Sequence, residues 1–506
     1  CGSGSFLIRA FQEVCIAVEE KLKKGEKSNN PTFKNYSERL NLAQKITILT
    51  RCIYGVDLDE KAVELAQLNL LLKILEEETR ETRRRILPSM KDNIKNGNSL
   101  IEDYKVAGDK AFKWEAQFPD VFKQGGFDVV IGNPPYGADL KENERIWLED
   151  RYKMKNTDTA VLFMKLATEI IKEKGVNGFI VPKPFVYSST WDKIRKHLLL
   201  GLREIVDCGK VWKEVLLEQV IYFYSTNKET NYYNSCVREK ANIKKIGEID
   251  KNTFDEFEFL LNSISEEELK LGKKIRNVKN FLGDFIINQR GAIYQKYIKQ
   301  KQTAKTDFKV LGGKQINRYF IKQDVKGYID KKFLEDKKSL IKENSILAQR
   351  IVAHVENPRD HIIIMASLSK GIDFKEFIIV DTINQLQNKS KNSSEFFVAI
   401  VNSKLVSWYA YRFIFGKAIR TMQFDNPVTD RIPIHLPSSQ QEKRIVDLVN
   451  QMLSLQQKYH SKGLSGNEKE RLEQQIKNVD YEIDEEIYKL YNLTAGEIKI
   501  IEESLR

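Results

Sequence analysis

The sequence is poor in the residues that build disulfide frameworks and metal centres. Its 506 residues include only five cysteines, and no two of them form a Cys-x-x-Cys pair. We therefore expect reduced thiols, no disulfide scaffold and no metal site. The five are Cys1, Cys15, Cys52, Cys208 and Cys236.

Long apolar runs are absent as well. No run reaches about 18 residues, the length that spans a bilayer, and no secretory signal opens the chain. The sequence thus predicts no membrane partner and a cytoplasmic location. The chain begins without Met, inside the stretch CGSGSFLIRAF, so we expect it to be a piece of a longer protein.

Positive charge is in excess. The formal net charge is +12, and 41% of the residues are hydrophobic, which is enough to bury sizeable cores. At about 150 residues per domain, the length predicts roughly three domains. The charge favours a polyanionic partner, with a lysine-rich solvated surface as the alternative.

The stretch FDVVIGNPPYG, residues 127–137, is the most informative. Its first part has the composition of a buried central strand. Two consecutive prolines then end the strand, because proline cannot donate to a ladder and it forces the preceding residue out of the helical region. An amide, Asn133, and an aromatic ring, Tyr136, are thereby presented at a strand tip.

A glycine loop opens the chain. Gly2 and Gly4 bracket Ser3, and a helical pattern follows at once. Such a loop lets a ligand approach the backbone and directs free N–H groups at it. The sequence does not match a dinucleotide-binding fingerprint, because the third small residue is missing, nor a phosphate-binding loop, because Gly-Lys-Ser/Thr is missing. Two interpretations remain: a loop that binds S-adenosylmethionine, or an ordinary loop.

Residues 53–72 predict a strand, an acidic tip and a helix. Asp57 follows the strand, Asp59 is a predicted helix cap, and Ala62, Val63, Ala66 and Leu70 form one apolar face. A carboxylate at the tip of the second strand of an α/β sheet is suited to bind a ribose diol.

These elements occur in a fixed order: the glycine loop, Asp57, NIKNGNSL (residues 93–100) and IGNPPY. This order resembles the adenine-N6 DNA methyltransferases of the gamma class, in particular the TaqI-like and type IIG restriction–modification family. The run FKWEAQFPDVFKQGGFDVVIGNPPY is similar to the sequence that this family usually has before its catalytic tip. The resemblance extends over nearly the whole chain and implies a prokaryotic restriction or defence role.

The resemblance implies a catalytic tip made of Asn133, Pro134, Pro135 and Tyr136. The Asn133 side chain and the Pro134 carbonyl would accept from the two N–H bonds of an adenine amine, and Pro135 would hold that carbonyl rigid. Tyr136 and Trp212 would stack on the two faces of a flipped-out base.

The resemblance also implies an S-adenosylmethionine site. Its residues would be Cys1, Gly2, Gly4, Asp57, Leu58, Asn98, Ser99 and Asn133. Asn98 stands where the family often has Asp, which removes a charge and predicts weaker cofactor binding. The family's first strand would precede Cys1, so the activity of this chain alone is in question.

We expect an α/β chain with four parts. Residues 1–228 would form a Rossmann-like class I methyltransferase domain, with a mixed seven-stranded sheet whose first strand is missing. In that domain, residues 158–175 would form an amphipathic helix that stops at Gly175. Residues 229–273 would be a spacer, 274–437 an α+β TaqI-like target-recognition domain, and 438–506 a helical C-terminal region.

The recognition domain should contact double-stranded DNA through basic side chains, either at base edges or at phosphates. We expect a monomer. Any nuclease domain would lie upstream of Cys1, because no pair of carboxylates with a lysine suggests one here. The candidate DNA contacts are Arg290, Lys314, Arg318, Arg350, Arg412, Arg420 and Arg431.

Other functions remain open. A fragment without a complete cofactor site would bind DNA without catalysis. Asn-Pro-Pro-Tyr also occurs in protein-glutamine and some RNA methyltransferases, although a long second domain is not needed there. A cytosine-N4 enzyme would use similar chemistry, with Ser more often at the position of Asn133.

Overall fold

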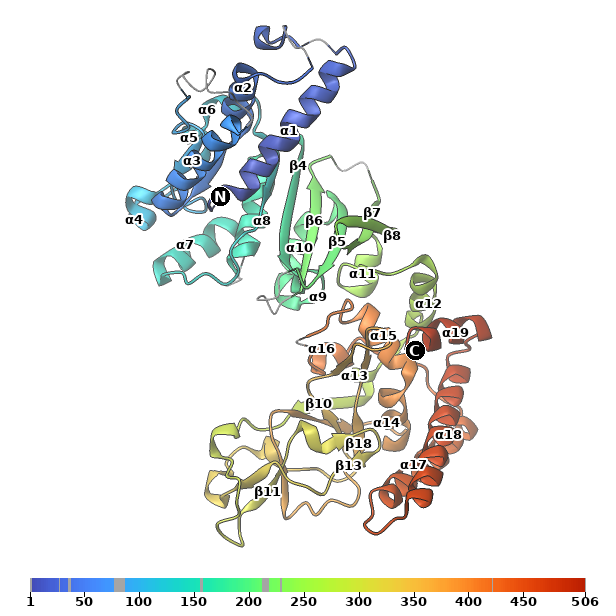
Figure 1. Cartoon of the computed structure of the whole chain (residues 1–506). Helices are drawn as coiled ribbons and strands as arrows, with labels where there is room; N and C mark the ends of the chain where they lie inside the picture. The colour runs from blue at the N-terminus through green and yellow to red at the C-terminus, as the bar shows by residue number, and fades with distance from the viewer. Residues whose placement is uncertain are drawn as a thin grey trace. The chain divides into compact units, whose positions relative to one another are not determined.

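The computed structural model describes residues 2–26, 28–34, 38–76, 87–154, 158–211, 218–227, 230–420 and 422–505. The chain divides into two compact units (Figure 1). Unit 1 comprises Cys1–Val211 with Gln219–Asn234, and unit 2 comprises Trp212–Glu218 with Ser235–Arg506. Cys1, Trp212 and the arginines at 83–85 lie outside the described residues.

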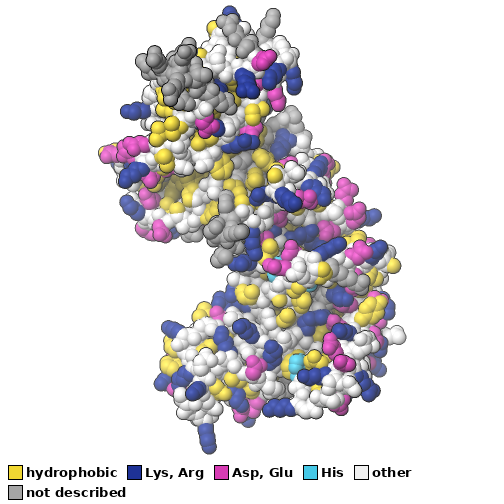
Figure 2. Space-filling view, viewed as in Figure 1, with side chains coloured by type: hydrophobic (Ala, Val, Ile, Leu, Met, Phe, Trp, Pro, Cys, Tyr) yellow, Lys and Arg dark blue, Asp and Glu magenta, His cyan; other side chains and the backbone are white. Residues whose placement is uncertain are grey.

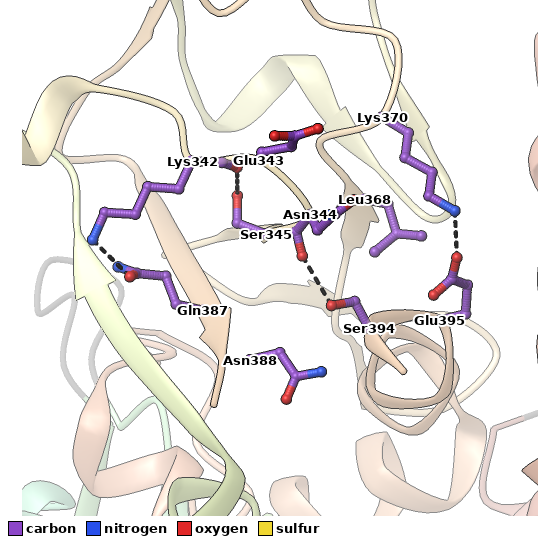
Figure 3. A pocket seen from close by; sticks show the side chains of 10 residues that line it. All are labelled: Lys342, Glu343, Asn344, Ser345, Leu368, Lys370, Gln387, Asn388, Ser394 and Glu395. Atoms are coloured by element: carbon purple, nitrogen blue, oxygen red, sulfur yellow. Dashed lines mark hydrogen bonds and ion pairs between the residues drawn. The ribbon is translucent and has the colours of Figure 1, made fainter. Parts of the chain in front are cut away.

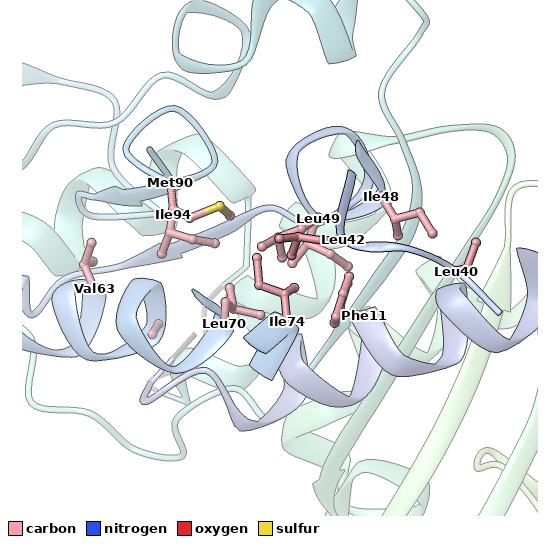
Figure 4. Packing of buried hydrophobic residues seen from close by; sticks show 12 residues of the cluster. Phe11, Leu40, Leu42, Ile48, Leu49, Val63, Leu70, Ile74, Met90 and Ile94 are labelled. Carbon is pink, nitrogen blue, oxygen red and sulfur yellow. The ribbon is translucent and has the colours of Figure 1, made fainter. Parts of the chain in front are cut away.

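Three helices of unit 1 pack around an apolar core (Figure 4). They are α1 (Ser5–Lys23), α2 (Leu42–Cys52) and α3 (Glu60–Leu75). Asp59 caps α3 by accepting from the N–H of Lys61, as the sequence predicted. The α3 face that enters the core contains Val63, Ala66, Leu70 and Ile74.

Two separate sheets lie wholly or mainly in unit 1. Strands β1 (Gly55–Asp57) and β2 (Ile94–Asn96) pair in parallel with each other. A six-stranded mixed sheet has the order β3-β4-β6-β5-β7-β8, and the division between the units falls within β7. Its strands are β3 (Phe127–Gly132), β4 (Ile171–Pro182), β5 (Leu202–Gly209), β6 (Gln219–Ser225), β7 (Tyr232–Glu239) and β8 (Asn242–Asp250).

Mixed α/β content is confirmed, but the described strands do not form one seven-stranded sheet. β3 pairs with β4 alone, so it is an edge strand here rather than the buried central strand that its composition predicted. Val129 is 57% and Ile131 42% exposed. Phe127, the first residue of β3, contacts Tyr54, which directly precedes β1; the two ring centroids are 5.7 Å apart.

The helix expected over 158–175 ends early. α8 covers Thr159–Ile170, and β4 begins at Ile171. Gly175 lies in β4, where a Cβ atom would stand 3.0 Å from the carbonyl oxygen of Phe127. This glycine therefore permits close pairing with β3 and does not stop a helix.

The remaining helices of unit 1 are short. They are α4 (Tyr104–Ala107), α5 (Trp114–Gln117), α6 (Pro119–Phe122), α7 (Glu142–Tyr152), α9 (Pro184–Tyr187), α10 (Asp192–Leu199) and the 3-10 turns Pro31–Phe33, Gly108–Lys110 and Ser189–Trp191.

Within the segment expected as a spacer, residues 229–273, the described residues 230–273 are folded. They contain β7, β8, α11 (Thr253–Phe257) and most of α12 (Glu266–Arg276). Phe254, Phe257 and Leu260 are buried, so this segment contributes to a core.

The rest of unit 2 combines short strands with helices. A four-stranded sheet has the order β10-β20-β15-β18, and a three-stranded sheet has the order β14-β11-β19. The strands are β9 (Asn280–Phe281), β10 (Ile286–Arg290), β11 (Phe308–Leu311), β12 (Ile316–Asn317), β13 (Phe320–Ile321), β14 (Gly327–Ile329), β15 (Ile346–Gln349), β16 (Ala353–Val355), β17 (His361–Ile363), β18 (Ala366–Leu368), β19 (Phe377–Ile379), β20 (Ile383–Asn388) and β21 (Pro433–Ile434).

Helix α14 packs against β18 of the four-stranded sheet, and the later helices α17, α18 and α19 lead to the C-terminus (Figure 1). In the part of the chain that the structure describes, no helix is long and apolar enough to cross a bilayer. The helices are α13 (Leu282–Phe285), α14 (Ser394–Asn402), α15 (Lys404–Phe413), α16 (Asn426–Thr429), α17 (Ser439–Tyr459), α18 (Gly466–Leu490) and α19 (Ala495–Glu503).

Candidate active site

The glycine loop and the acidic strand tip contact each other. The N–H of Gly2 donates to Asp57 Oδ2 at 2.7 Å, and the N–H of Asp59 donates to Asp57 Oδ1 at 3.0 Å. Gly4 caps α1 at φ +88°, and a Cβ atom there would stand 3.1 Å from Cα of Ala66 in α3. Glycine is thus required twice over, by the left-handed backbone and by the close approach of α3.

An amide that the sequence analysis did not single out joins the tips of β1 and β2. Nδ2 of Asn96 donates to the carbonyls of Asp57 and Leu58, at 3.0 Å each. The predicted cofactor residue Asn98 uses its Oδ1 to accept from the N–H of Leu100 at 3.1 Å. Leu58 is 57% exposed beside them. The only sequence signal for Asn96 was its place in NIKNGNSL.

The tip after β3 is held by its own aromatic residue. The hydroxyl of Tyr136 donates to Asn133 Oδ1 at 2.5 Å and lies 3.4 Å from the carbonyl oxygen of Ile180 in β4. Asn133 is exposed, Pro134 is buried and Tyr136 is half-buried. Burial, with a smaller contribution from Asp158, raises the pKa of Tyr136 to about 12, so its hydroxyl keeps its proton at neutral pH.

The two parts of the predicted site come from different sheets. Gly2, Asp57 and the Asn96 amide gather at β1 and β2, whereas Asn133 and Tyr136 follow β3. A mainly aromatic cluster joins the two halves, with Val56, Phe112 and Phe118 at its centre and Tyr54 and Phe127 packed against them. No group of three or more metal-binding side chains was found among the described residues.

Three of the seven predicted DNA contacts are engaged inside unit 2. Arg412 is 5% exposed, and its Nε donates to Glu268 at 2.6 Å. Arg318 forms two hydrogen bonds with Asp480, at 2.8 and 2.7 Å. Arg431 donates to the carbonyls of residues 257 and 413. These contacts hold the fold together, and the burial of Arg412 leaves it no surface for DNA.

Of the other four predicted contacts, Lys314, Arg420 and Arg290 reach the surface, whereas the Arg350 side chain is only 14% exposed. Lys314 and Arg420 are exposed. Arg290 pairs with Asp381 at 2.9 Å, and Arg350 pairs with Asp425 at 3.1 Å. The visible face of unit 2 carries lysine and arginine side chains interspersed with acidic ones (Figure 2).

A hollow of about 500 Å³ lies elsewhere in unit 2, between β15, β18, β20 and α14 (Figure 3). Two lysines and two glutamates line it; Lys370 pairs with Glu395, and Lys342 Nζ donates to the amide oxygen of Gln387 at 2.6 Å. This neutral polar lining contains none of the predicted site residues.

The sequence and the structure both match known proteins. Residues 51–212 match the model of the Eco57I restriction-modification methylase family. The chain is 30% identical over 340 residues to the type II restriction enzyme and methyltransferase RM.Eco57I of Escherichia coli, covering 59% of this chain and 34% of that protein. It is 23% identical over 544 residues to the putative type II restriction enzyme and methyltransferase RM.MjaORFECS2P of Methanocaldococcus jannaschii, covering 96% of this chain and 42% of that protein.

Two solved structures share the fold. The type IIL restriction-modification enzyme MmeI, solved in complex with DNA, matches with a TM-score of 0.65 at 12% identity, over 100% of this chain and 71% of that one. A nuclease-deletion mutant of the type ISP enzyme LlaGI, solved with a DNA substrate mimic, matches with a TM-score of 0.53 at 12% identity, over 92% and 44%. The chain spans less than half the length of the curated relatives it matches.

Proposed function

Because its sequence is similar to type II restriction-modification methyltransferases, we propose that this chain is the methyltransferase and target-recognition part of a type IIG enzyme. It transfers a methyl group from S-adenosylmethionine to the exocyclic N6 of an adenine that is flipped out of double-stranded DNA. The observation that carries the proposal is the tip after β3, where Asn133 and Pro134 offer two acceptors side by side in sequence.

The tip suits an adenine amine for chemical reasons. The lone pair of N6 is delocalised into the ring, and two acceptors on its N–H bonds make the lone pair available for attack. Asn133 Oδ1 already accepts a hydrogen bond from Tyr136, so its acceptor function is present in the structure. No hydrogen bond reaches the carbonyl of Pro134 from the described residues, which leaves that acceptor for the second N–H.

On this proposal, an amine entering the site replaces the Tyr136 hydroxyl as the donor to Asn133. Tyr136 then presents its ring to the base while its hydroxyl remains near Ile180. Because the pKa of Tyr136 is raised to about 12, the phenol brings no negative charge to the reacting amine.

The tips of β1 and β2 fit the cofactor. Asp57 is a carboxylate fixed by backbone N–H groups, which suits a ribose diol, and the exposed Leu58 beside it suits an adenine face. When bound, S-adenosylmethionine supplies an electrophilic methyl group. The chain's own work is to orient the amine and to exclude water.

DNA recognition falls to unit 2. A base inside a duplex cannot reach the tip, and flipping it out costs a few kcal/mol that DNA contacts must offset. We assign this role to the surface cations Lys314 and Arg420 and to Arg290, whose guanidinium group is oriented by Asp381. Arg350 is largely buried against Asp425, like the arginines engaged inside unit 2.

The test is mass spectrometry of nucleosides from unmethylated mixed-sequence DNA incubated with S-adenosylmethionine. It uses this chain, any longer product of the same reading frame, and Asn133→Ala in each. We expect N6-methyladenine from the active form and its loss, by at least about 100-fold, in the variant.

Other outcomes separate the alternatives. Methylcytosine in place of methyladenine would indicate a cytosine-N4 enzyme. DNA binding without methylation or cofactor binding would indicate a recognition fragment. Cofactor binding without methylation of any DNA would turn attention to protein and RNA substrates.

A further inference from the structure

We propose that Thr159, the first residue of α8, is a positioning residue for the catalytic tip. Its hydroxyl holds the turn that carries Tyr136, and through that turn it sets the direction of the Pro134 carbonyl. The proposal rests on the proposed function, and one arm of its test does not depend on activity.

The hydroxyl of Thr159 bridges the turn. It donates to the carbonyl oxygen of Pro135 at 2.7 Å and accepts from the N–H of Ala138 at 3.4 Å. Thr159 is 2% exposed, so water does not compete for these bonds. One side-chain oxygen thus ties together residues 135 and 138, with Tyr136 and Gly137 between them.

The neighbouring residue adds a second attachment. Asp158 is the N-cap of α8 and accepts from the N–H of Ala160 at 3.0 Å. The same oxygen lies 3.4 Å from the N–H of Gly137, which has φ +58°. The beginning of α8 therefore fixes the far side of the turn, while β3 leads into its near side.

We call these contacts of Thr159 and Asp158 with residues 135–138 the clamp. The clamp matters because the reacting groups need a fixed geometry. Pro134 and Asn133 precede the clamped residues directly, and the ring of Pro135 limits how far the chain can compensate. Besides these contacts from Asp158 and Thr159, the Tyr136 hydroxyl also holds the tip, but it must release Asn133 when an amine binds. A displacement of about 1 Å at such a site can lower turnover about 100-fold.

The chemistry of threonine allows a clean test. Thr159→Val keeps the shape but removes the donor and acceptor, whereas Thr159→Ser keeps the hydroxyl. Thr168→Val is a matched control on the same helix, because the Thr168 hydroxyl also bonds a carbonyl, that of Lys165, at 2.8 Å, away from the tip.

In a methylation assay we expect Thr159→Val to lower kcat about 10- to 100-fold, with KM for the cofactor and Kd for DNA within about threefold of wild type. Thr159→Ser should retain most of the turnover, and Thr168→Val should behave like wild type. Wild-type turnover in Thr159→Val, or an equal loss in Thr159→Ser, would overturn the proposal.

Hydrogen exchange tests the clamp without activity. The Ala138 amide, protected by the Thr159 hydroxyl, should exchange at least about tenfold faster in Thr159→Val but not in Thr159→Ser or Thr168→Val. If the wild type methylates nothing while this pattern is observed, the proposed function fails and the clamp stands. If exchange is unchanged in Thr159→Val, the clamp itself is refuted.

Discussion

The two units hold their predicted site residues in different ways. In unit 1, Asp57, Asn133 and Tyr136 are fixed by backbone groups and by each other. In unit 2, the predicted arginines bind carboxylates far along the chain: Arg412 and Glu268 are 144 residues apart, and Arg318 and Asp480 are 162 apart. Exposed apolar side chains, Val129 and Ile131, accompany the site in unit 1.

The difference shows what a short motif can reveal. The motif Asn-Pro-Pro-Tyr contains the hydrogen-bond partner of its own amide, since Tyr136 donates to Asn133, although Thr159 holds the following turn from 24 residues away. An arginine in unit 2 is available to bind DNA only if no distant carboxylate pairs with it and makes it part of the fold. The residues next to it in the sequence do not decide which role it has.

Removing the Arg412–Glu268 ion pair from unit 2 should have the largest effect on stability. Arg412→Met leaves the Glu268 carboxylate, 15% exposed, with Lys417, at 3.3 Å, as its remaining cationic partner. We expect the free energy of unfolding to fall by about 3–5 kcal/mol in urea denaturation. The double variant with Glu268→Gln should recover part of that loss. A change in the free energy of unfolding below about 1 kcal/mol would show that Arg412 does not stabilise the fold.

The second prediction concerns pH. Burial, with Asp480 adding to it, raises the pKa of Asp484 from 3.8 to about 6, against the effects of Arg318 and Lys404. The folded protein then binds this proton more tightly than the unfolded chain. Its contribution therefore favours folding at low pH and is lost as pH rises from about 4 to about 6, by about 3 kcal/mol in total.

Asp484→Asn should remove this dependence. We expect the stability difference between variant and wild type to change by about 3 kcal/mol between about pH 3 and about pH 7 and to stay constant above. Denaturation at each pH measures the difference, so the other titrating groups cancel. Parallel stability profiles for the two proteins would contradict the prediction.

A milder change tests the cofactor tip of unit 1. Asp57→Ala removes a charged acceptor, and we expect Kd for S-adenosylmethionine to rise about 10- to 100-fold in calorimetric titration. Asp59→Asn is the control, because asparagine caps a helix as well as aspartate does. If Asp57→Ala binds the cofactor as the control does, the ribose role of Asp57 is wrong.

The smallest effect should come from a surface cation of unit 2. Lys314→Ala should weaken DNA binding a few-fold at low salt and reduce the slope of log K against log salt by about one. Fluorescence anisotropy across a salt series measures both. Lys477→Ala, on the exposed side of α18, should leave the slope unchanged. An unchanged slope in Lys314→Ala would remove this residue from the DNA surface.

Sequence patterns predicted elements whose causes are local. The Asp59 cap, the apolar face of α3 and the strand tip at Asp57 all depend on residues within a turn or two. Gly175 was misjudged because its role is set by β3, forty-odd residues earlier, against which it must pack closely. Thr159 gave no signal, since a threonine after aspartate is ordinary at the start of a helix.

The aromatic cluster between β1 and β3 has a practical consequence. Nε1 of Trp114 donates to the carbonyl of Ser99 at 2.9 Å, and the Trp114 ring lies 5.7 Å from Phe127, at the start of the strand that carries Asn133. Indole emission responds to the polarity and hydrogen bonding around the ring. Trp114 is therefore a natural optical reporter between the two halves of the site, and replacing the other tryptophans with phenylalanine would let its emission follow ligand binding in real time.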